Sequence, residues 1–135
     1  MIDLPNSFKE IGNNAFNWCN KLKTINLNDN IIRIGSYAFE ALGGSMALVL
    51  STLPANLIDL NTYAFSCCPN VTFTVLPRTL KTLGQGAFHN ASKVNIAQIG
   101  YPNSDFELSI ANGVFAGTGE SVTELTLYPF KNSGA

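Results

Sequence analysis

The dipeptide Ala-Phe recurs along this chain at nearly constant spacing. Four segments end with it and a fifth ends with Val-Phe: FKEIGNNAF (8–16), IIRIGSYAF (31–39), LIDLNTYAF (57–65), LKTLGQGAF (80–88) and LSIANGVF (108–115). The closing residues are Phe16, Phe39, Phe65, Phe88 and Phe115, at intervals of 23, 26, 23 and 27 residues. An apolar residue lies five positions before each of them. Self-similarity at such a period is typical of a repeat solenoid, in which each repeat is one coil.

Glycine follows that apolar residue in three of the copies. It is present as Gly12, Gly35 and Gly84, and Asn61 takes the same place in the third copy. Glycine, and after it asparagine, tolerates left-handed backbone better than other residue types. We therefore expect a left-handed residue at this point of the coil.

A second apolar pattern follows the phenylalanines. In the first copy, LKTINLNDN (22–30) has the pattern L-x-x-I-x-L-x-x-N, which is the strand signature of a leucine-rich repeat. VTFTVLP (71–77) and VTELTL (122–127) hold comparable places later in the chain. We predict coils made of a short strand, a turn, the Ile-Gly stretch and a tight helical turn that carries Ala-Phe. Because stacked coils share one core, the phenylalanines should form a column.

Length and charge restrict the number of domains and the class of partner. A chain of 135 residues can bury one core, so we predict a single leucine-rich-repeat domain over residues 1–135. Only 13% of the residues are charged and the net charge is −1, so no basic excess exists for a phosphate backbone or an anionic membrane. The first residues lack the features of a secretory signal, and no apolar run could cross a bilayer. We predict neither nucleic-acid binding nor membrane insertion.

The side chains that carry chemistry are few and scattered. His89 is the only histidine, and we expect it on an exposed turn, without the base and nucleophile that catalysis requires. Cys19 and Cys68 occupy a small apolar position of the repeat, so we expect both to be buried and inert. The carboxylates show no recurring spacing, and no C-x-x-C pair is present. We predict no enzyme activity, no catalytic residues, no metal site and no cofactor.

The repeats closely resemble the BspA-like leucine-rich repeat, a bacterial surface-antigen type. Its 23-residue pattern is I-G-x-x-A-F-x-x-C-x-x-L-x-x-I-x-L-P, and IGNNAFNWCNKLKTINLN (11–28) matches nearly throughout, with Asn28 in place of proline. The likeness covers residues 4–127. The resemblance implies an α/β repeat solenoid, a right-handed superhelix of short parallel strands and short helical turns with about five coils. It also implies a non-enzymatic protein that binds a macromolecular ligand.

The exposed face of the strands is the expected binding surface. Residues that point inward should alternate with exposed ones, and the exposed set is apolar in the middle coils. We predict a partner-binding patch there, made of Leu50, Phe73, Val75, Ile96 and Tyr128. A one-residue slip of the register is the alternative, and it would bury Phe73 and Val75.

Two functional classes remain. The first is a protein-interaction or adhesion module that binds a protein or other macromolecule through this face, at the cell surface or outside the cell as the resemblance implies. The second is a structural subunit of a surface layer or a phage particle, for which a cytoplasmic or virion location stays open. The sequence further predicts that the chain pairs with copies of itself or is a piece of a longer array whose neighbours cover its ends, because the two ends expose apolar residues of the core type. These are Leu4, Phe8 and Ile11 at one end and Leu125, Leu127 and Phe130 at the other.

Overall fold

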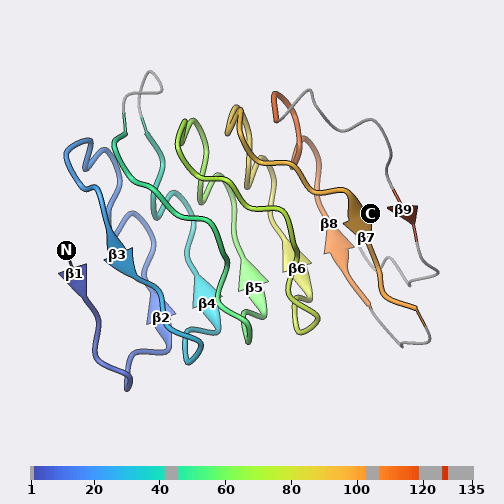
Figure 1. The fold of residues 1–135 in the computed structure, drawn as a ribbon, viewed down its shortest axis with the longest axis horizontal. Helices are drawn as coiled ribbons and strands as arrows, with labels where there is room; N and C mark the ends of the chain where they lie inside the picture. The colour runs from blue at the N-terminus through green and yellow to red at the C-terminus, as the bar shows by residue number, and fades with distance from the viewer. Residues whose placement is uncertain (1, 42–45, 103–106, 119–125, 128–135) are drawn as a thin grey trace.

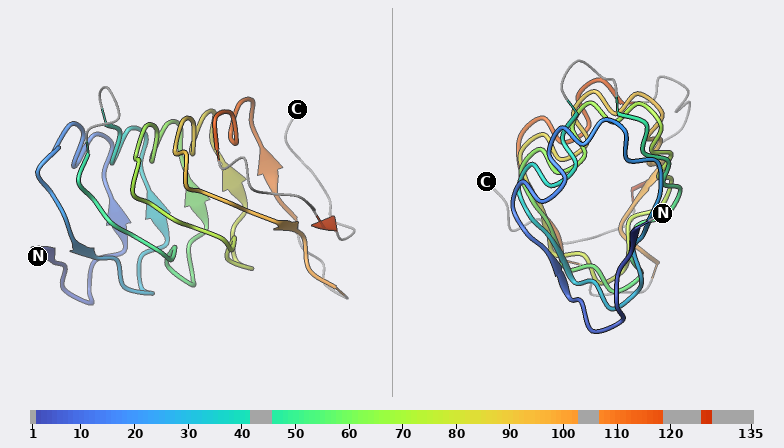
Figure 2. Two further views of the ribbon diagram at one scale, coloured as in Figure 1. Left: turned by 45° about the horizontal axis from the view of Figure 1, so that its top comes forward. Right: turned by 90° about the vertical axis from the view of Figure 1, so that its left-hand side faces the viewer.

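Successive coils of the chain stack along one axis in the computed structural model (Figure 1). The structure describes residues 2–41, 46–102, 107–118 and 126–127. Viewed along the stacking direction, the coils superpose around one shared interior (Figure 2). The predicted repeat solenoid with short parallel strands is therefore confirmed.

One side of the solenoid is a five-stranded parallel sheet. Its strands, in spatial order, are β2 (Glu10–Ile11), β4 (Arg33–Ile34), β5 (Asp59–Leu60), β6 (Thr82–Leu83) and β8 (Ser109–Ile110). The register aligns the apolar residue of each strand with the next, as in the pairs Ile34–Leu60 and Leu60–Leu83. Side chains alternate along a strand, so this apolar residue faces the interior and the residue before it faces outward. The most regular strands thus lie in the Ile-Gly stretches.

The other side, here called the second face, carries the L-x-x-I-x-L segments. Its strands are β1 (Ile2–Asp3) paired with β3 (Ile25–Asn26), and β7 (Gln98–Ile99) paired with β9 (Thr126–Leu127), all parallel. Between these pairs, a single parallel bridge joins Leu50 to Val71. The expected strands are therefore present on this face, but they pair over shorter and interrupted stretches.

The segments that carry Ala-Phe are hydrogen-bonded turns, and no helix occurs in the described residues. The expected helical turns are therefore absent there, because left-handed residues flank the phenylalanines. Positive φ recurs two positions before the phenylalanine, at Asn14, Tyr37, Tyr63, Gly86 and Gly113, and two positions after it, at Trp18, Cys67, Asn90 and Gly117. A left-handed residue at this spacing interrupts a right-handed helix.

These turns also form a ladder between coils. The N–H of Phe39 donates to the carbonyl of Ala64 at 2.8 Å, and the N–H of Phe65 donates to that of Ala87 at 2.9 Å. Intervening residues bond within their own turn, as when the N–H of Ala64 donates to the carbonyl of Asn61 at 3.2 Å. Coil stacking therefore satisfies backbone groups that a helix would otherwise pair internally.

Two of the glycines after the apolar strand residue, Gly35 and Gly84, are needed for space. Gly12, Gly35 and Gly84 do not have positive φ, and neither does Asn61, so the expected left-handed conformation is wrong at these places. A Cβ on Gly84 would lie 2.4 Å from the backbone nitrogen of Thr62, in the preceding coil. A Cβ on Gly12 would meet nothing within 4 Å, because no coil precedes it in the structure.

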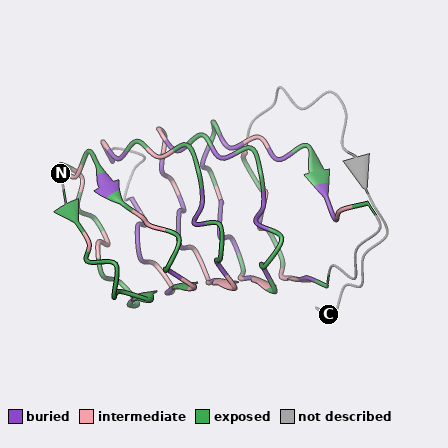
Figure 3. Cartoon of the chain, turned by 60° about the horizontal axis from the view of Figure 1, so that its bottom comes forward, coloured by how far each residue is buried: buried purple, intermediate pink, exposed green. Residues whose placement is uncertain are grey.

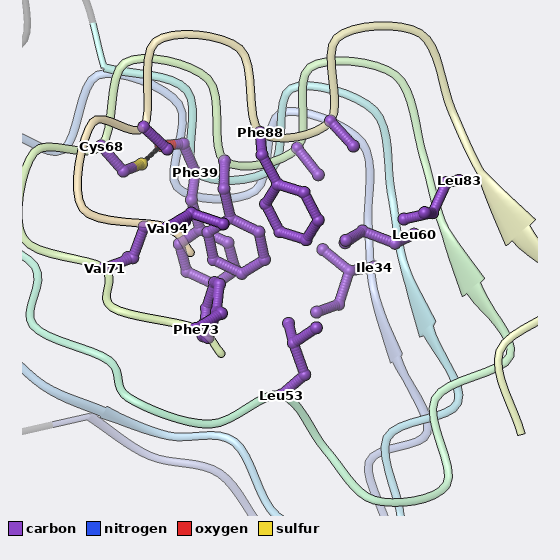
Figure 4. Close-up of a cluster of buried hydrophobic side chains, with 14 of the residues drawn as sticks. Ile34, Phe39, Leu53, Leu60, Cys68, Val71, Phe73, Leu83, Phe88 and Val94 are labelled. Carbon is purple, nitrogen blue, oxygen red and sulfur yellow. Dashed lines mark hydrogen bonds between the residues drawn. The ribbon is translucent and has the colours of Figure 1, made fainter. Parts of the chain in front are cut away.

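The predicted phenylalanine column fills the centre of the core. Neighbouring rings stack with centroid separations of 5.3 Å (Phe16–Phe39), 5.0 Å (Phe39–Phe65), 6.4 Å (Phe65–Phe88) and 5.9 Å (Phe88–Phe115). The aliphatic residues Ile34, Leu60 and Leu83 of the five-stranded sheet face the rings (Figure 4). The inner members of the column are buried, whereas Phe16 and Phe115 are half-buried.

Candidate functional site

The predicted partner-binding patch is only partly exposed. Val75 is 64% exposed and Leu50 is half-buried. Phe73 is 0% exposed and Ile96 is 7% exposed, so the expectation that they lie on the surface is wrong. Tyr128 lies outside the described residues.

Phe73 is buried because the apolar spacing changes between coils. In the first coil the buried strand residue is Ile25, nine positions after Phe16, as the L-x-x-I-x-L pattern requires. In the third coil the corresponding place holds exposed Thr74, and Phe73, one residue earlier, enters the core. Its ring packs edge-on against Phe65, with centroids 5.0 Å apart and an interplanar angle of 70°.

The same change occurs in the fourth coil, and a sequence signal for it exists. V-x-F-x-x-L (71–76) and V-x-I-x-x-I (94–99) share an apolar spacing that differs from L-x-x-I-x-L. Ile96 is buried for the same reason as Phe73, while the alternative register slip is wrong for Val75, which stays exposed. Two successive residues then face outward in each middle coil: Ser51–Thr52, Thr74–Val75 and Ala97–Gln98.

The first two of these pairs, Ser51–Thr52 and Thr74–Val75, line a groove with a volume of about 440 Å³. It is lined by residues 51–53 and Ala55 of the second coil, residues 74–78 of the third, and Tyr101 of the fourth. We call it the Arg78 groove. Its base is apolar, since Leu53, Leu76 and Pro77 are buried there, and exposed hydroxyl side chains stand on its wall.

A small residue opens the groove. Ala55, Arg78 and Tyr101 lie two positions after the buried aliphatic residues Leu53, Leu76 and Ile99, so they form one row across three coils. Arg78 and Tyr101 fill their places with long side chains, whereas Ala55 leaves a gap beside them. In the first coil this row begins with Asp29, whose Oδ1 accepts the N–H of Ala55 at 2.8 Å.

Tyr101 and Arg78 form a defined pair at one end of the groove. The hydroxyl of Tyr101 donates to the carbonyl of Leu76, which fixes its ring. The guanidinium carbon of Arg78 lies 4.3 Å from the centroid of that ring, a cation–π arrangement. Burial raises the pKa of Tyr101, with Arg78 opposing the shift, so the hydroxyl stays protonated and donating at neutral pH.

The reactive side chains of the described residues differ in their burial and in their partners. Cys68 is buried, its Sγ donates to the carbonyl of Phe39 at 2.9 Å, and burial raises the pKa of its thiol to about 12. Cys19 is exposed, against expectation, because the first coil has a neighbour on one side only. His89 is half-buried and packs edge-on against Tyr63, at 6.0 Å between centroids. Among the described residues, no group of three or more His, Cys, Asp or Glu side chains could hold a metal ion.

Comparison with protein families decides which repeat class this is. The family model of the BspA type leucine rich repeat region (6 copies) matches residues 1–120. The chain belongs to this family. No curated protein and no solved structure matches it significantly. Leucine-rich repeats of this kind serve in protein interaction, are generally not enzymes and are usually associated with surfaces.

The BspA-type pattern accounts for the base of the Arg78 groove. The Leu-Pro pair that closes the repeat is present as Leu53-Pro54 and Leu76-Pro77, and all four residues are buried. In the described part of this BspA-type chain, no helix is long and apolar enough to cross a membrane. The base of the groove is built on Leu-Pro pairs that recur in the chain, and its walls come from side chains that vary between coils.

Proposed function

We propose that this chain is a non-enzymatic interaction module that binds a macromolecular partner through the Arg78 groove and the second face around it. The observation that carries the proposal is the exposure of aliphatic side chains there. Val75 is 64% exposed and Val49 is 57% exposed, whereas the core-facing residues beside them are buried. Aliphatic surface beside a groove is typical of a protein contact site.

The surroundings favour a protein over a charged polymer as the partner. Exposed residues next to the groove are mainly uncharged and polar, namely Ser51, Thr52, Thr72, Thr74 and Gln98. With a net charge of −1, the chain lacks the basic excess that nucleic-acid binding requires. Adhesion at a bacterial cell surface is the specific role that we propose, in keeping with the family.

The test measures binding of the purified chain to a panel of purified extracellular-matrix and cell-surface proteins by biolayer interferometry. Val75→Glu should weaken any binding found by tenfold or more, because it places a charge in the apolar contact. Gln85→Glu is the matched control, since Gln85 is exposed on a turn away from the groove. Equal binding by the two variants would exclude this face as the contact site.

A structural role in a larger assembly is the second candidate, and the first coil favours it. Phe8 is 46% exposed and Trp18 is 56% exposed. Figure 3 shows that exposed positions are frequent near the N-terminus, whereas buried positions are frequent in the inner coils. Of the other residues expected at this end, Leu4 is half-buried and Ile11 is buried at 4% exposure, so the expectation is wrong for Ile11. The side chains of Leu125, Leu127 and Phe130 lie outside the described residues. We propose that such assembly proceeds through copies of the chain.

A further inference from the structure

The base of the Arg78 groove can take apolar side chains. Leu53 is 8% exposed and Leu76 is 2% exposed, so each presents only a small part of its surface to the groove. Val75 stands beside them with most of its surface open. A volume of about 440 Å³ lies within the range of ligand pockets, and it suits a few residues of a partner chain.

Backbone N–H groups without a hydrogen-bond acceptor among the described residues border the same groove. The N–H groups of Ser51, Thr52, Thr74 and Val75 donate no hydrogen bond to any described residue. The parallel bridge Leu50–Val71 ends just before them, and the next bond between coils runs from the N–H of Asn95 to the carbonyl of Phe73, at 2.9 Å. Main-chain donors without a partner can pair with an extended segment of another protein.

The guanidinium of Arg78 is oriented so that its N–H donors can bind an anion. The face of its guanidinium is engaged by the ring of Tyr101, and cation–π contact leaves the N–H donors at the edge of the group unused. The ring is itself held by the bond to the carbonyl of Leu76. A fork of donors that is already oriented loses less conformational freedom when it binds a carboxylate.

No carboxylate of the described residues forms an ion pair with Arg78. The residues that line the groove include no Asp or Glu. Asp29 belongs to the same row, but its Oδ1 bonds to Ala55 at 2.8 Å, and it lies two coils from Arg78. At about 4.8 Å per coil that separation is about 10 Å, beyond hydrogen-bonding distance. The positive charge is therefore available to a partner.

We infer that the Arg78 groove recognises an extended protein segment in which apolar residues are followed by an acidic side chain. The apolar residues lie on Leu53, Leu76 and Val75, and the carboxylate bonds to the guanidinium of Arg78. Hydroxyl and N–H groups of the outward pairs bond to the backbone of the segment. This inference rests on the proposed interaction function and specifies the partner's chemistry.

The experiment uses two capped peptides, acetyl-Ser-Leu-Val-Glu-Ser-amide and its Gln counterpart. Each is titrated into the full chain, and backbone amide shifts are followed by NMR. We expect shifts at residues 51–55 and 74–78, and binding of the Glu peptide that is up to about fivefold tighter, the upper end of the range for an exposed ion pair. Arg78→Gln should abolish this preference, and Arg78→Lys should restore part of it because the charge returns without the fork.

Arg33→Gln is the matched control, because Arg33 and Arg78 are the only arginines and Arg33 is exposed on the opposite sheet. It should leave the preference unchanged. Equal shifts by both peptides in the native chain would overturn the carboxylate recognition while leaving binding at the groove intact. Shifts by neither peptide at millimolar concentration would overturn the inference as a whole, and the Val75→Glu comparison would then decide the proposed function separately.

Discussion

Phe39 and Phe65 stack with their ring centroids 5.0 Å apart and their planes within 4° of parallel. This separation is close to the 4.7–4.9 Å between neighbouring strands, so one ring fills the height of one coil. The next pair, Phe65 and Phe88, is 6.4 Å apart, and Phe73 packs against both of these rings. Phe73 is therefore an additional ring beside the column, at the pair whose rings are farthest apart.

The column predicts that stability losses depend on position along it. Phe65→Ala should lower the free energy of unfolding by about 3–5 kcal/mol, because it opens a cavity between coils on both sides. Phe115→Ala should cost distinctly less, since Phe115 is half-buried. Urea denaturation of the two variants and the native chain measures this difference. Equal losses would contradict a column that is most tightly packed at its centre.

A second pair of variants tests the register of the third coil. Phe73→Ala should cost about 3–5 kcal/mol, because the side chain is fully buried among aromatic rings. Val75→Ala, two residues later, should change stability by less than about 0.5 kcal/mol because Val75 is exposed. Chemical denaturation checks both values. If Val75→Ala were the more damaging change, the segment would have the opposite face inward.

The sequence predicted the repeat and the column because both depend on exact recurrence. The phenylalanine returns at the same height in every coil, and periodic apolar residues determine which side faces the core. The patch was harder to predict, since moving one apolar residue by a single position reverses its side. By the L-x-x-I-x-L pattern the residue at position 74 should face the core, but Phe73 faces it instead. In the sequence, only a comparison of V-x-F-x-x-L with L-x-x-I-x-L reveals this change.

The turns and the groove depend on contacts between coils, which the sequence does not display directly. Tyr37 and Tyr63 adopt positive φ, although bulky residues rarely do so, because stacking against the next coil fixes their backbone. The groove likewise arises from the sizes of Ala55, Arg78 and Tyr101, which are distant in sequence but form one row. The conformational preferences of single residues therefore predict neither the positive φ of these tyrosines nor the groove.

The close approach of coils at Gly84 gives a third prediction. Gly84→Ala should lower the free energy of unfolding by about 1–3 kcal/mol, because the new methyl group would meet the backbone of Thr62. Gly12→Ala is the control, since nothing lies within 4 Å of the added Cβ. It should be neutral or slightly stabilising, because alanine restricts the unfolded chain. Thermal melts of both variants measure the contrast, and equal effects would indicate that coil contact is not the cause.

Burial of Cys68 predicts a loss of stability at alkaline pH. Its folded-state pKa is raised from 9.0 to about 12, mainly by desolvation. Below pH 9 the thiol is protonated in both states; above it, the unfolded chain ionises first, so stability falls as pH rises towards 12. Between pH 8 and pH 10 the native chain should lose roughly 1 kcal/mol more than Cys68→Ala does. Urea denaturation at the two pH values measures this, and parallel losses would mean that the thiol is accessible to solvent.

The open side of the first coil predicts association between copies of the chain. Phe8 is 46% exposed, whereas the equivalent residues of the inner coils, Ile31, Leu57 and Leu80, are at most 1% exposed. Trp18 adds a second exposed aromatic side chain, and β2 has a neighbouring strand on one side only. An unpaired strand edge beside apolar surface favours pairing with another chain.

Sedimentation velocity of the purified chain at micromolar concentration should therefore show species larger than a monomer. The double variant Phe8→Ser with Trp18→Ser should shift the distribution towards the monomer, because it removes the exposed aromatic surface of the first coil. Val75→Ser is the control, since it removes an equally exposed apolar side chain elsewhere and should leave the distribution unchanged. A native chain that sediments as a monomer would rule out self-association through this end. If Val75→Ser dissociated the species and the double variant did not, the contact would instead lie at the Arg78 groove.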